Sequence, residues 1–284
     1  MSITPQPNLW QCGPFALKHA LISHGIFADE NDISRIAGTR SAYGTDEQQL
    51  ARAARAFNCT MPTIRRHTPE GAKYELLGYL REGFPALICV YDWSHWITVV
   101  KSEQGKYITL DSRDKAVLTI LTWSELKNRW VYYEQDEEDE THWESIYDFN
   151  PIIPRFRVKT RAKFSIARAH YLRRKQNRDL ARFWDQYVAD LLDICRARTS
   201  LSRKVLSLGE FFRRHEDIIL EQVDYWHGRI SRKDAGKILS NMKFVADTYG
   251  LVIHEEDEKR AIAGITSILT LWAAGNSPVK PVYR

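Results

Sequence analysis

Apolar side chains recur every three or four residues in four segments of the first half of the chain. In the first segment, residues 17, 20, 21 and 22 are apolar, so a helix there would bury one face. Later segments begin at capping or turn residues such as Thr45 and Thr68. The pattern predicts helices at residues 13–24, 30–37, 45–57 and 69–82.

Runs of β-branched and aromatic residues follow these helical segments. The stretch from His95 to Val100 has the composition of a strand, and residues 102–106 then have the composition of a turn. Helices that precede an antiparallel sheet indicate an α+β fold. We expect a short helix from about residue 122, and strands at residues 85–91, 95–102, 106–111 and 116–121.

The second half of the chain lacks this alternation and has helical spacing instead. Apolar residues from Trp184 to Cys195 recur at helical positions, and Ser207 and Ser231 begin sequences that resemble capping boxes. The last helix is expected to end at Gly275. We predict an all-α helical domain of about four to six helices in this half.

The distribution of charged residues also changes near residue 150. Residues 1–150 carry 15 Lys and Arg against 21 Asp and Glu, whereas residues 151–284 carry 26 against 15, so the net charges are −6 and +11. An acidic run at 134–140 marks the border and is followed shortly by Pro151 and Pro154. These observations predict an α+β domain at 1–150 and a basic α-helical domain at 151–284.

Cys12 has the position of a nucleophile. It would open the first helix, where unsatisfied backbone N–H groups and the helix dipole favour a thiolate. Gly13 permits close backbone approach, and Pro14 suits the first turn of a helix because its missing N–H costs nothing there. The sequence therefore indicates a reactive thiol that is held rigidly at a helix tip.

A thiolate that attacks a carbonyl needs a base, a group that orients the base, and donors for the oxyanion. His95 is the candidate base at the start of one expected strand, and Asp111 ends the strand that returns beside it. In such a hairpin the two side chains lie near the open ends and can meet, so Asp111 would fix the imidazole tautomer. Gln6 is the candidate oxyanion donor, with Gln11 as a competing candidate.

These four residues resemble a known arrangement. Gln6, Cys12, His95 and Asp111 stand in the order and spacing of papain-like cysteine peptidases. The stretches Gln-x5-Cys-Gly, His-Trp-Ile-Thr-Val-Val and Leu-Asp-Ser are similar to the bacteriocin-processing, double-glycine leader peptidases and their stand-alone relatives. The resemblance covers the first half of the chain and implies a papain-like fold. It also implies the role of each residue: Gln6 would stabilise the oxyanion, Cys12 would be the nucleophile, His95 the base and Asp111 the carboxylate that orients the base. The residues before Cys12 and after Asp111 depart from the family pattern, so the cleavage site is not implied.

Neighbouring aromatic residues and the other cysteines have simpler interpretations. Trp10 and Trp93 are candidate substrate-binding residues, because they flank the proposed centre and could wall a cleft that holds an extended peptide. Trp96 is expected to pack in the core. The other three cysteines stand in apolar runs and have the character of buried small hydrophobic residues.

The sequence argues against several other classes of protein. It contains no Cys-x2-Cys pair, no His-Glu-x-x-His and no glycine-rich phosphate loop, so we expect neither a metal nor a cofactor. The longest apolar stretch, residues 261–274, is shorter than the roughly 20 residues that span a bilayer. The N-terminus has no secretory pattern, and scattered cysteines suit a reducing compartment, so we expect a cytoplasmic protein without membrane contact.

The expected partner is a peptide or protein substrate. The leading hypothesis is a cysteine peptidase that cleaves a peptide or isopeptide bond through a thioester acyl-enzyme on Cys12. An acyl transferase of transglutaminase type would use the same residues, and a non-catalytic peptide-binding module is the third alternative. The basic tract at 155–182 could contact nucleic acid, but docking onto a protein partner or onto the first domain is favoured.

Overall fold

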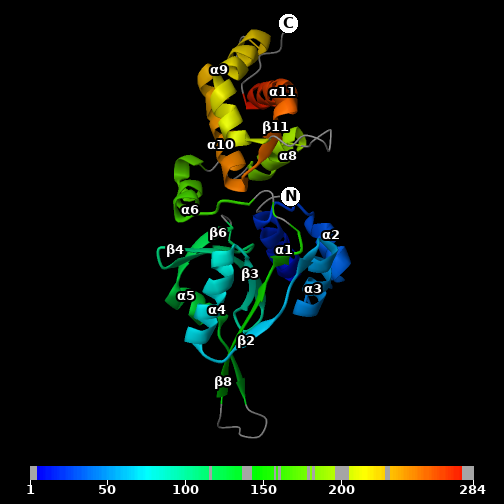
Figure 1. Ribbon diagram of the computed structural model, residues 1–284, viewed down its shortest axis with the longest axis vertical. Coiled ribbons are helices and arrows are strands. Elements are labelled where there is room, and N and C mark those ends of the chain that lie inside the picture. Colours follow the sequence, from blue (N-terminus) through cyan, green and yellow to red (C-terminus); the bar gives the residue numbers. More distant parts are fainter. Residues whose placement is uncertain are drawn as a thin grey trace. The chain divides into compact units, whose positions relative to one another are not determined.

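The computed structural model describes residues 5–114, 117–135, 143–156, 158, 161–177, 180, 183–195, 205–227 and 231–276. It divides into two compact units, residues 1–182 and 183–284. The first is built around a sheet and the second is mainly helical (Figure 1). Residues 151–182 fall in the first unit in this division, and the assignment of 151–284 to one domain stays a prediction.

A seven-stranded antiparallel sheet forms the framework of the first unit. Its strands follow the order β2-β8-β3-β4-β5-β6, and β7 pairs with the first residues of β8. A separate pair joins β1 and β9. The four strands expected from residue 85 to residue 121 are confirmed. The bounds are β1 (Cys59–Thr60), β2 (Ile64–Arg66), β3 (Ala86–Val90), β4 (His95–Glu103), β5 (Lys106–Leu110), β6 (Leu118–Thr122), β7 (Tyr132–Gln135), β8 (Trp143–Pro151) and β9 (Ile153–Pro154).

Side chains alternate along the strands and give the sheet two apolar faces. On one face, Leu87 and Cys89 of β3 pack with α1, α2 and α3, whereas Ile88 and Val90 on the other face pack with α4 and α5. Figure 1 shows these helices as two groups beside the sheet. The expected helices and the α+β class are confirmed. The bounds are α1 (Cys12–Ser23), α2 (Glu30–Ala37), α3 (Glu47–Ala56), α4 (Pro69–Glu82) and α5 (Trp123–Trp130).

The helix α1 is buried on all sides rather than on one face. Its first eleven residues are buried, including Lys18, whose Nζ lies 2.8 Å from Oε2 of Glu30. Thr98 of β4 donates a hydrogen bond from Oγ1 to the backbone oxygen of Ala16, at 2.7 Å. Because packing and hydrogen bonds hold α1 from several sides, its first residue, Cys12, has a fixed position on the sheet.

His19 gives the stability of this unit a measurable pH dependence. The side chain is fully buried, and neither ring nitrogen has a hydrogen-bond partner among the described residues. Burial, and then the charge of Lys18, lower the pKa of His19 from 6.5 to about 3. Below pH 6.5 the unfolded chain therefore binds a proton that the folded chain does not bind. The free energy of unfolding should fall by roughly 2 kcal/mol between pH 6.5 and about pH 5.

Urea unfolding of the wild type and of His19→Leu at these two pH values checks this expectation. The fall should be smaller in the variant, because the titrating group is gone. His24, whose pKa burial also lowers, accounts for part of what remains. An equal fall in the two proteins would contradict the prediction.

The strand β8 was not predicted from the sequence. It pairs with β2, β3 and β7 and lies inside the sheet, although its residues stand at the expected domain border. The acidic run that marked this border falls mostly on residues 136–140, which lie outside the described residues. The partners of β8 include Ile64, which pairs with Phe149. Such long-range pairing leaves no local pattern in the sequence.

The second unit consists of helices together with one two-stranded sheet, in which β10 pairs with β11. Ser207 caps α9 as expected, because its Oγ accepts a hydrogen bond from the N–H of Glu210 at 3.1 Å. The capping box expected at Ser231 is wrong, since that side chain makes no cap hydrogen bond before α10. The bounds are α8 (Trp184–Cys195), β10 (Val205–Ser207), α9 (Leu208–His227), α10 (Arg232–Tyr249), β11 (Val252–His254), η3 (Glu255–Asp257) and α11 (Glu258–Asn276).

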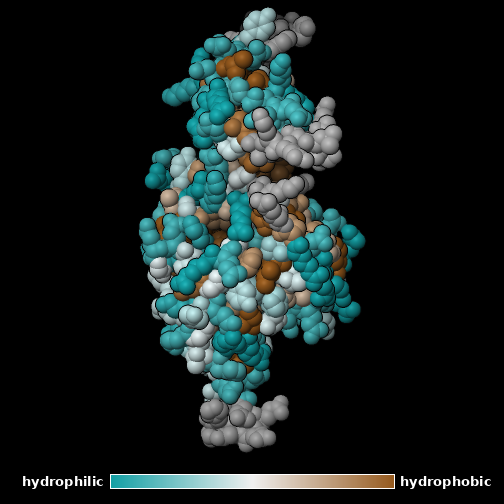
Figure 2. Space-filling model, in the orientation of Figure 1, coloured by the Kyte–Doolittle hydropathy of each residue, from teal (hydrophilic) through white to brown (hydrophobic). Residues whose placement is uncertain are grey.

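The basic tract makes contacts within the first unit. Arg161 donates to the backbone oxygen of Glu82 at 3.2 Å, and Arg173 donates to Oδ2 of Asp114 at 3.1 Å. Residues 157, 159, 160, 178, 179, 181 and 182 of the tract lie outside the described residues. The visible surface is largely hydrophilic, with hydrophobic side chains in small patches (Figure 2). The tract contains α6 (Ile166–Arg173) and η2 (Lys175–Asn177).

Candidate active site

Cys12 is the first residue of α1 and directly follows η1 (Leu9–Gln11). Only 6% of its surface is exposed. Burial opposes ionisation, but the His95 imidazole and the backbone of Trp96 lower the pKa of the Cys12 thiol below its ordinary value. The positive end of the helix dipole acts in the same direction. The site therefore favours a thiolate.

His95 directly follows a turn whose backbone is strained. Between β3 and β4, Tyr91, Asp92 and Trp93 have φ values of +55°, +53° and +56°. The left-handed region costs a non-glycine residue about 1–2 kcal/mol, and such residues gather at functional sites. Ser94 closes the turn with a hydrogen bond from its N–H to the last backbone oxygen of β3, at 3.1 Å. This turn fixes where β4 begins, and with it the imidazole.

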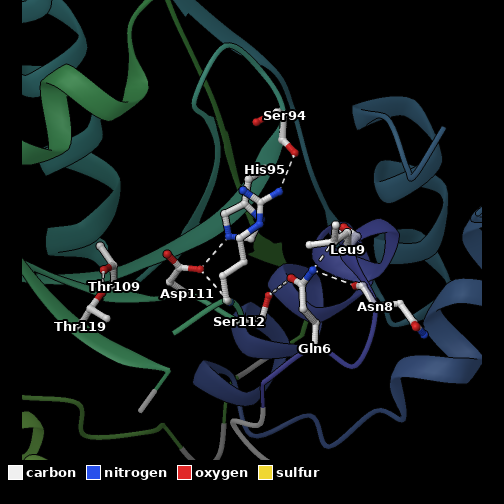
Figure 3. Close-up of polar contacts among 10 residues, drawn as sticks. Gln6, Asn8, Leu9, Ser94, His95, Thr109, Asp111, Ser112 and Thr119 are labelled. Atoms are coloured by element: carbon white, nitrogen blue, oxygen red, sulfur yellow. Dashed lines mark hydrogen bonds and ion pairs between the residues drawn. The ribbon is translucent and has the colours of Figure 1, made fainter. Parts of the chain in front are cut away.

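Asp111 follows β5 and meets the imidazole of His95 (Figure 3). Nε2 of His95 lies 2.7 Å from Oδ1 of Asp111, and the same oxygen accepts a hydrogen bond from the N–H of Arg113 at 2.9 Å. Burial raises the pKa of Asp111, but the bonds from His95 and Arg113 outweigh it, and the pKa is lowered. The carboxylate is therefore charged and makes Nε2 the protonated nitrogen.

This contact leaves Nδ1 of His95 for the thiol. Nδ1 is buried and makes no hydrogen bond of ordinary geometry among the described residues, while Cys12 is close enough to affect the titration of the ring. Burial lowers the pKa of His95, but Asp111 and Cys12 more than offset this and raise it. A lowered thiol pKa beside a raised imidazole pKa favours a thiolate–imidazolium pair.

Gln6 lies beside Ser112, the residue after Asp111, and its amide makes three hydrogen bonds (Figure 3). Its Nε2 donates to the backbone oxygens of Asn8 and Leu9 at 2.8 and 3.2 Å, and its Oε1 accepts from Oγ of Ser112 at 2.5 Å. The amide N–H groups of Gln6 thus have two backbone acceptors within the chain. Gln11, the competing candidate, is buried and accepts a bond from Nδ2 of Asn8 at 3.1 Å.

Arg113 is a charged neighbour that the sequence reasoning missed. Its exposed side chain donates to the backbone oxygen of Ser94 at 3.2 Å, beside His95. Its charge lowers the pKa of both Cys12 and Asp111. A cation two residues after the expected carboxylate was a signal that the sequence did offer. Its side chain also helps to hold the turn before β4.

Of the candidate substrate-binding tryptophans, Trp93 lines a pocket of about 310 Å³. Its ring stacks on that of Tyr132 with centroids 3.9 Å apart. Trp10 belongs to η1 and is not among the lining residues of this pocket. Trp96 is 8% exposed and packs in the core as expected, although one edge reaches the pocket.

The other cysteines differ from Cys12 in their chemistry. All four cysteines are free. Burial raises the pKa of Cys59 to about 11 and the pKa values of Cys89 and Cys195 to about 12. These three are therefore thiols near neutral pH, and only Cys12 has a lowered pKa.

A metal site and a membrane-spanning helix each have structural requirements that the described residues do not meet. Their His, Cys, Asp and Glu side chains form no group of three or more suited to a metal ion. None of their helices is both long enough and apolar enough to cross a bilayer. The side chains described around Cys12 supply a nucleophile, a base and a buried carboxylate.

No family model matches the chain, and no curated protein matches it in sequence. Solved structures resemble it over about half its length. The peptidase domain of Streptococcus ComA, a bifunctional ABC transporter of a quorum-sensing pathway, is 17% identical with a TM-score of 0.38, and the match covers 54% of this chain and 97% of that one.

Two other solved structures give similar values. A double glycine motif protease from an AMS/PCAT transporter, in complex with its leader peptide, is 16% identical with a TM-score of 0.38, over 53% of this chain and 91% of that one. A protein from Bacillus anthracis described as a C39-like peptidase is 11% identical with a TM-score of 0.36, over 52% and 92%. All three are described as peptidases or peptidase domains.

Proposed function

We propose that this protein is a cysteine peptidase that cleaves a peptide or isopeptide bond through a thioester acyl-enzyme on Cys12. The observation that carries the proposal is the linked group of Cys12, His95 and Asp111. The Nε2–Oδ1 contact of 2.7 Å orients the imidazole, and His95 in turn lowers the pKa of the thiol. The motifs around these residues, which resemble papain-like peptidases, support the same assignment.

In the proposed reaction the Cys12 thiolate attacks the carbonyl carbon of the scissile bond. Nδ1 of the His95 imidazolium then gives its proton to the leaving amine, and the carbon–nitrogen bond breaks to leave a thioester. Water attacks the thioester with Nδ1 as the base, which releases the acid and restores the thiol pair. Asp111 stays ionised and stabilises the imidazolium throughout.

Gln6 is proposed to stabilise the oxyanion with one of its amide N–H groups, after exchanging a bond to Asn8 or Leu9. Gln6→Ala should lower kcat about 10²–10³-fold, as loss of an oxyanion donor does. Ser112→Ala is the matched control, because it removes only the bond to Oε1. If Gln6 only holds its segment against Ser112, Gln6→Ala and Ser112→Ala should lower the activity equally. That result would contradict the oxyanion role.

A peptide library made from a digested proteome tests the proposed function without knowledge of the substrate. We expect new peptide termini, detected by mass spectrometry, in the presence of the wild type and none with Cys12→Ala. Addition of a small primary amine separates hydrolysis from acyl transfer, since transfer makes an amide at the new carboxyl terminus, whose mass exceeds that of the acid by the mass of the amine minus one water. Binding of peptides without any new product would favour the non-catalytic binding module.

Location and partners remain part of the proposal. Four free cysteines are compatible with the reducing cytoplasm, where we place the reaction. We also propose that the basic second half docks onto a protein partner. Arg161 and Arg173 of the basic tract already bond to groups of the first unit, which favours protein contacts over nucleic acid.

A further inference from the structure

The pocket that Trp93 lines lies directly beside the proposed nucleophile. The backbone of Gly13, the residue after Cys12, packs against two of its walls, because a Cβ there would lie 3.0 Å from Cβ of Thr45 and 3.4 Å from Cδ1 of Trp96. The indole N–H of Trp96 donates to the backbone oxygen of Thr45 at 2.9 Å and joins these walls. The walls formed by Thr45 and Trp96 therefore lie against the residue that follows Cys12 in the chain.

Three of the residues that line the pocket are aromatic: Tyr43, Trp93 and Trp96. Trp93, which is 38% exposed, stacks on Tyr132, and the guanidinium carbon of Arg65 lies 5.8 Å from a centroid of the indole. Trp96 supplies a second indole, and Cys89 a nonpolar thiol. The volume of about 310 Å³ is at the lower end for ligand pockets and suits a single long side chain.

Among the described charged side chains that line the pocket, Glu47 is the one without a hydrogen bond or an ion pair. Arg65 binds Asp148 through two hydrogen bonds of 2.9 and 2.7 Å, so these charges neutralise each other. Asp46 accepts the N–H of Gln49 as the cap of α3. Glu47 is exposed and makes no hydrogen bond or ion pair among the described residues. The pocket is therefore partly aromatic, and its charged side chains sum to a net negative charge.

The field of Glu47 extends to the apolar side of the pocket. Burial is the main cause of the raised pKa of Cys89, and the negative charges of Cys12 and Glu47 contribute in the same direction. The carboxylate of Glu47 would attract a cation in the pocket while the aliphatic stem of that cation lies against the two indole rings. The surroundings thus suit a group that is apolar along its length and positive at its end.

Resting on the proposed function, we propose that this pocket selects substrates that carry a Lys or Arg side chain close to the scissile bond, with Glu47 as the residue that recognises the cation. Trp93 and Trp96 contact the aliphatic stem. Glu47 acts in specificity only and takes no part in bond breaking.

Glu47 also lies in the first turn of α3, where a carboxylate stabilises the helix dipole. A merely structural role would be shared by Glu70, an exposed carboxylate in the first turn of α4 that does not line the pocket. Glu70→Gln therefore removes the same charge from an equivalent helix position. It is the matched control for Glu47→Gln.

Acetyl-dipeptidyl chloromethyl ketones are suitable probes, because the Cys12 thiolate displaces chloride and the adduct is seen by intact mass. One set carries Lys and the other its neutral analogue norleucine, placed in turn at each of the two positions before the ketone. With the wild type, the second-order rate constant for Lys should exceed that for norleucine about fivefold or more at one position. Glu47→Gln should bring this ratio close to one, Glu47→Lys should invert it, and Glu70→Gln should keep it.

A ratio near one with the wild type at both positions would overturn the inference, and so would a ratio that Glu47→Gln leaves unchanged or that Glu70→Gln lowers equally. In each of these cases Cys12 is still alkylated, so the proposed peptidase activity survives. If no probe of either kind modifies Cys12, the proposed function itself is wrong.

Discussion

Cleavage should be abolished when Cys12 is replaced by Ala. The proposed reaction forms its covalent intermediate on Sγ, so removal of the sulfur should lower kcat/KM by a factor of about 10⁴ or more. Cys12→Ser should be almost as inactive, because a hydroxyl has a far higher pKa than a thiol and stays protonated beside His95. Product formation from the peptide library, followed by mass spectrometry, measures both variants.

The control for this prediction is Cys195→Ala, which removes a thiol whose pKa burial raises to about 12. This variant should cleave like the wild type and lose no labelling by iodoacetamide at neutral pH. Circular dichroism should show that Cys12→Ala keeps its fold, since the change removes one small side chain. Residual cleavage by Cys12→Ala close to the wild-type rate would exclude the proposed nucleophile.

Replacement of Asp111 by Asn should have the second largest effect. The carboxylate raises the pKa of His95, and the imidazolium lowers the pKa of Cys12. An amide in its place removes both effects and allows the wrong tautomer of the imidazole, so kcat/KM should fall about 10²–10⁴-fold. The pH profile should change as well. Activity requires a thiolate and an imidazolium, so the active range should become narrower at its acid and alkaline limits.

Alkylation by iodoacetamide as a function of pH reports the thiolate at Cys12 directly. In Asp111→Asn its midpoint should move to higher pH relative to the wild type. Asp114→Asn is the matched control, since it removes a carboxylate three residues away that pairs with Arg173. An unchanged midpoint in Asp111→Asn, or an equal shift in Asp114→Asn, would show that Asp111 does not tune this thiol.

Much of the geometry around His95 was predictable because it is local. The turn at Gln104 and Gly105 has φ values of +52° and +72°, as a tight hairpin requires, and it brings Asp111 back beside the start of β4. His95 and Asp111 are only 16 residues apart, so the hairpin alone brings their side chains into contact. The contact of Ser112 with Gln6 joins residues 106 apart, and no periodicity predicts it.

The contacts of Arg113 and the lining of the pocket could not be predicted from local sequence. Arg113 stood next to the candidate site in the sequence, but its bond to Ser94 depends on how the turn after β3 folds back. The pocket takes Glu47 from α3, Arg65 from β2 and Asp148 from β8. Since β8 was not predicted, neither its pairing with β2 nor the Arg65–Asp148 contact could be foreseen.

The sequence by itself determined the helices and hairpin strands of the first half and the position of Cys12 at a helix start. These depend on side-chain periodicity and on local caps, such as Thr68, which accepts the N–H of Gly71 at 3.3 Å. The tertiary structure alone decided the path of β8, the burial of α1 on all sides and the position of the Arg113 charge near Cys12. Those features arise when segments far apart in the chain bury surface against each other, and a local pattern carries no record of which distant segment that will be.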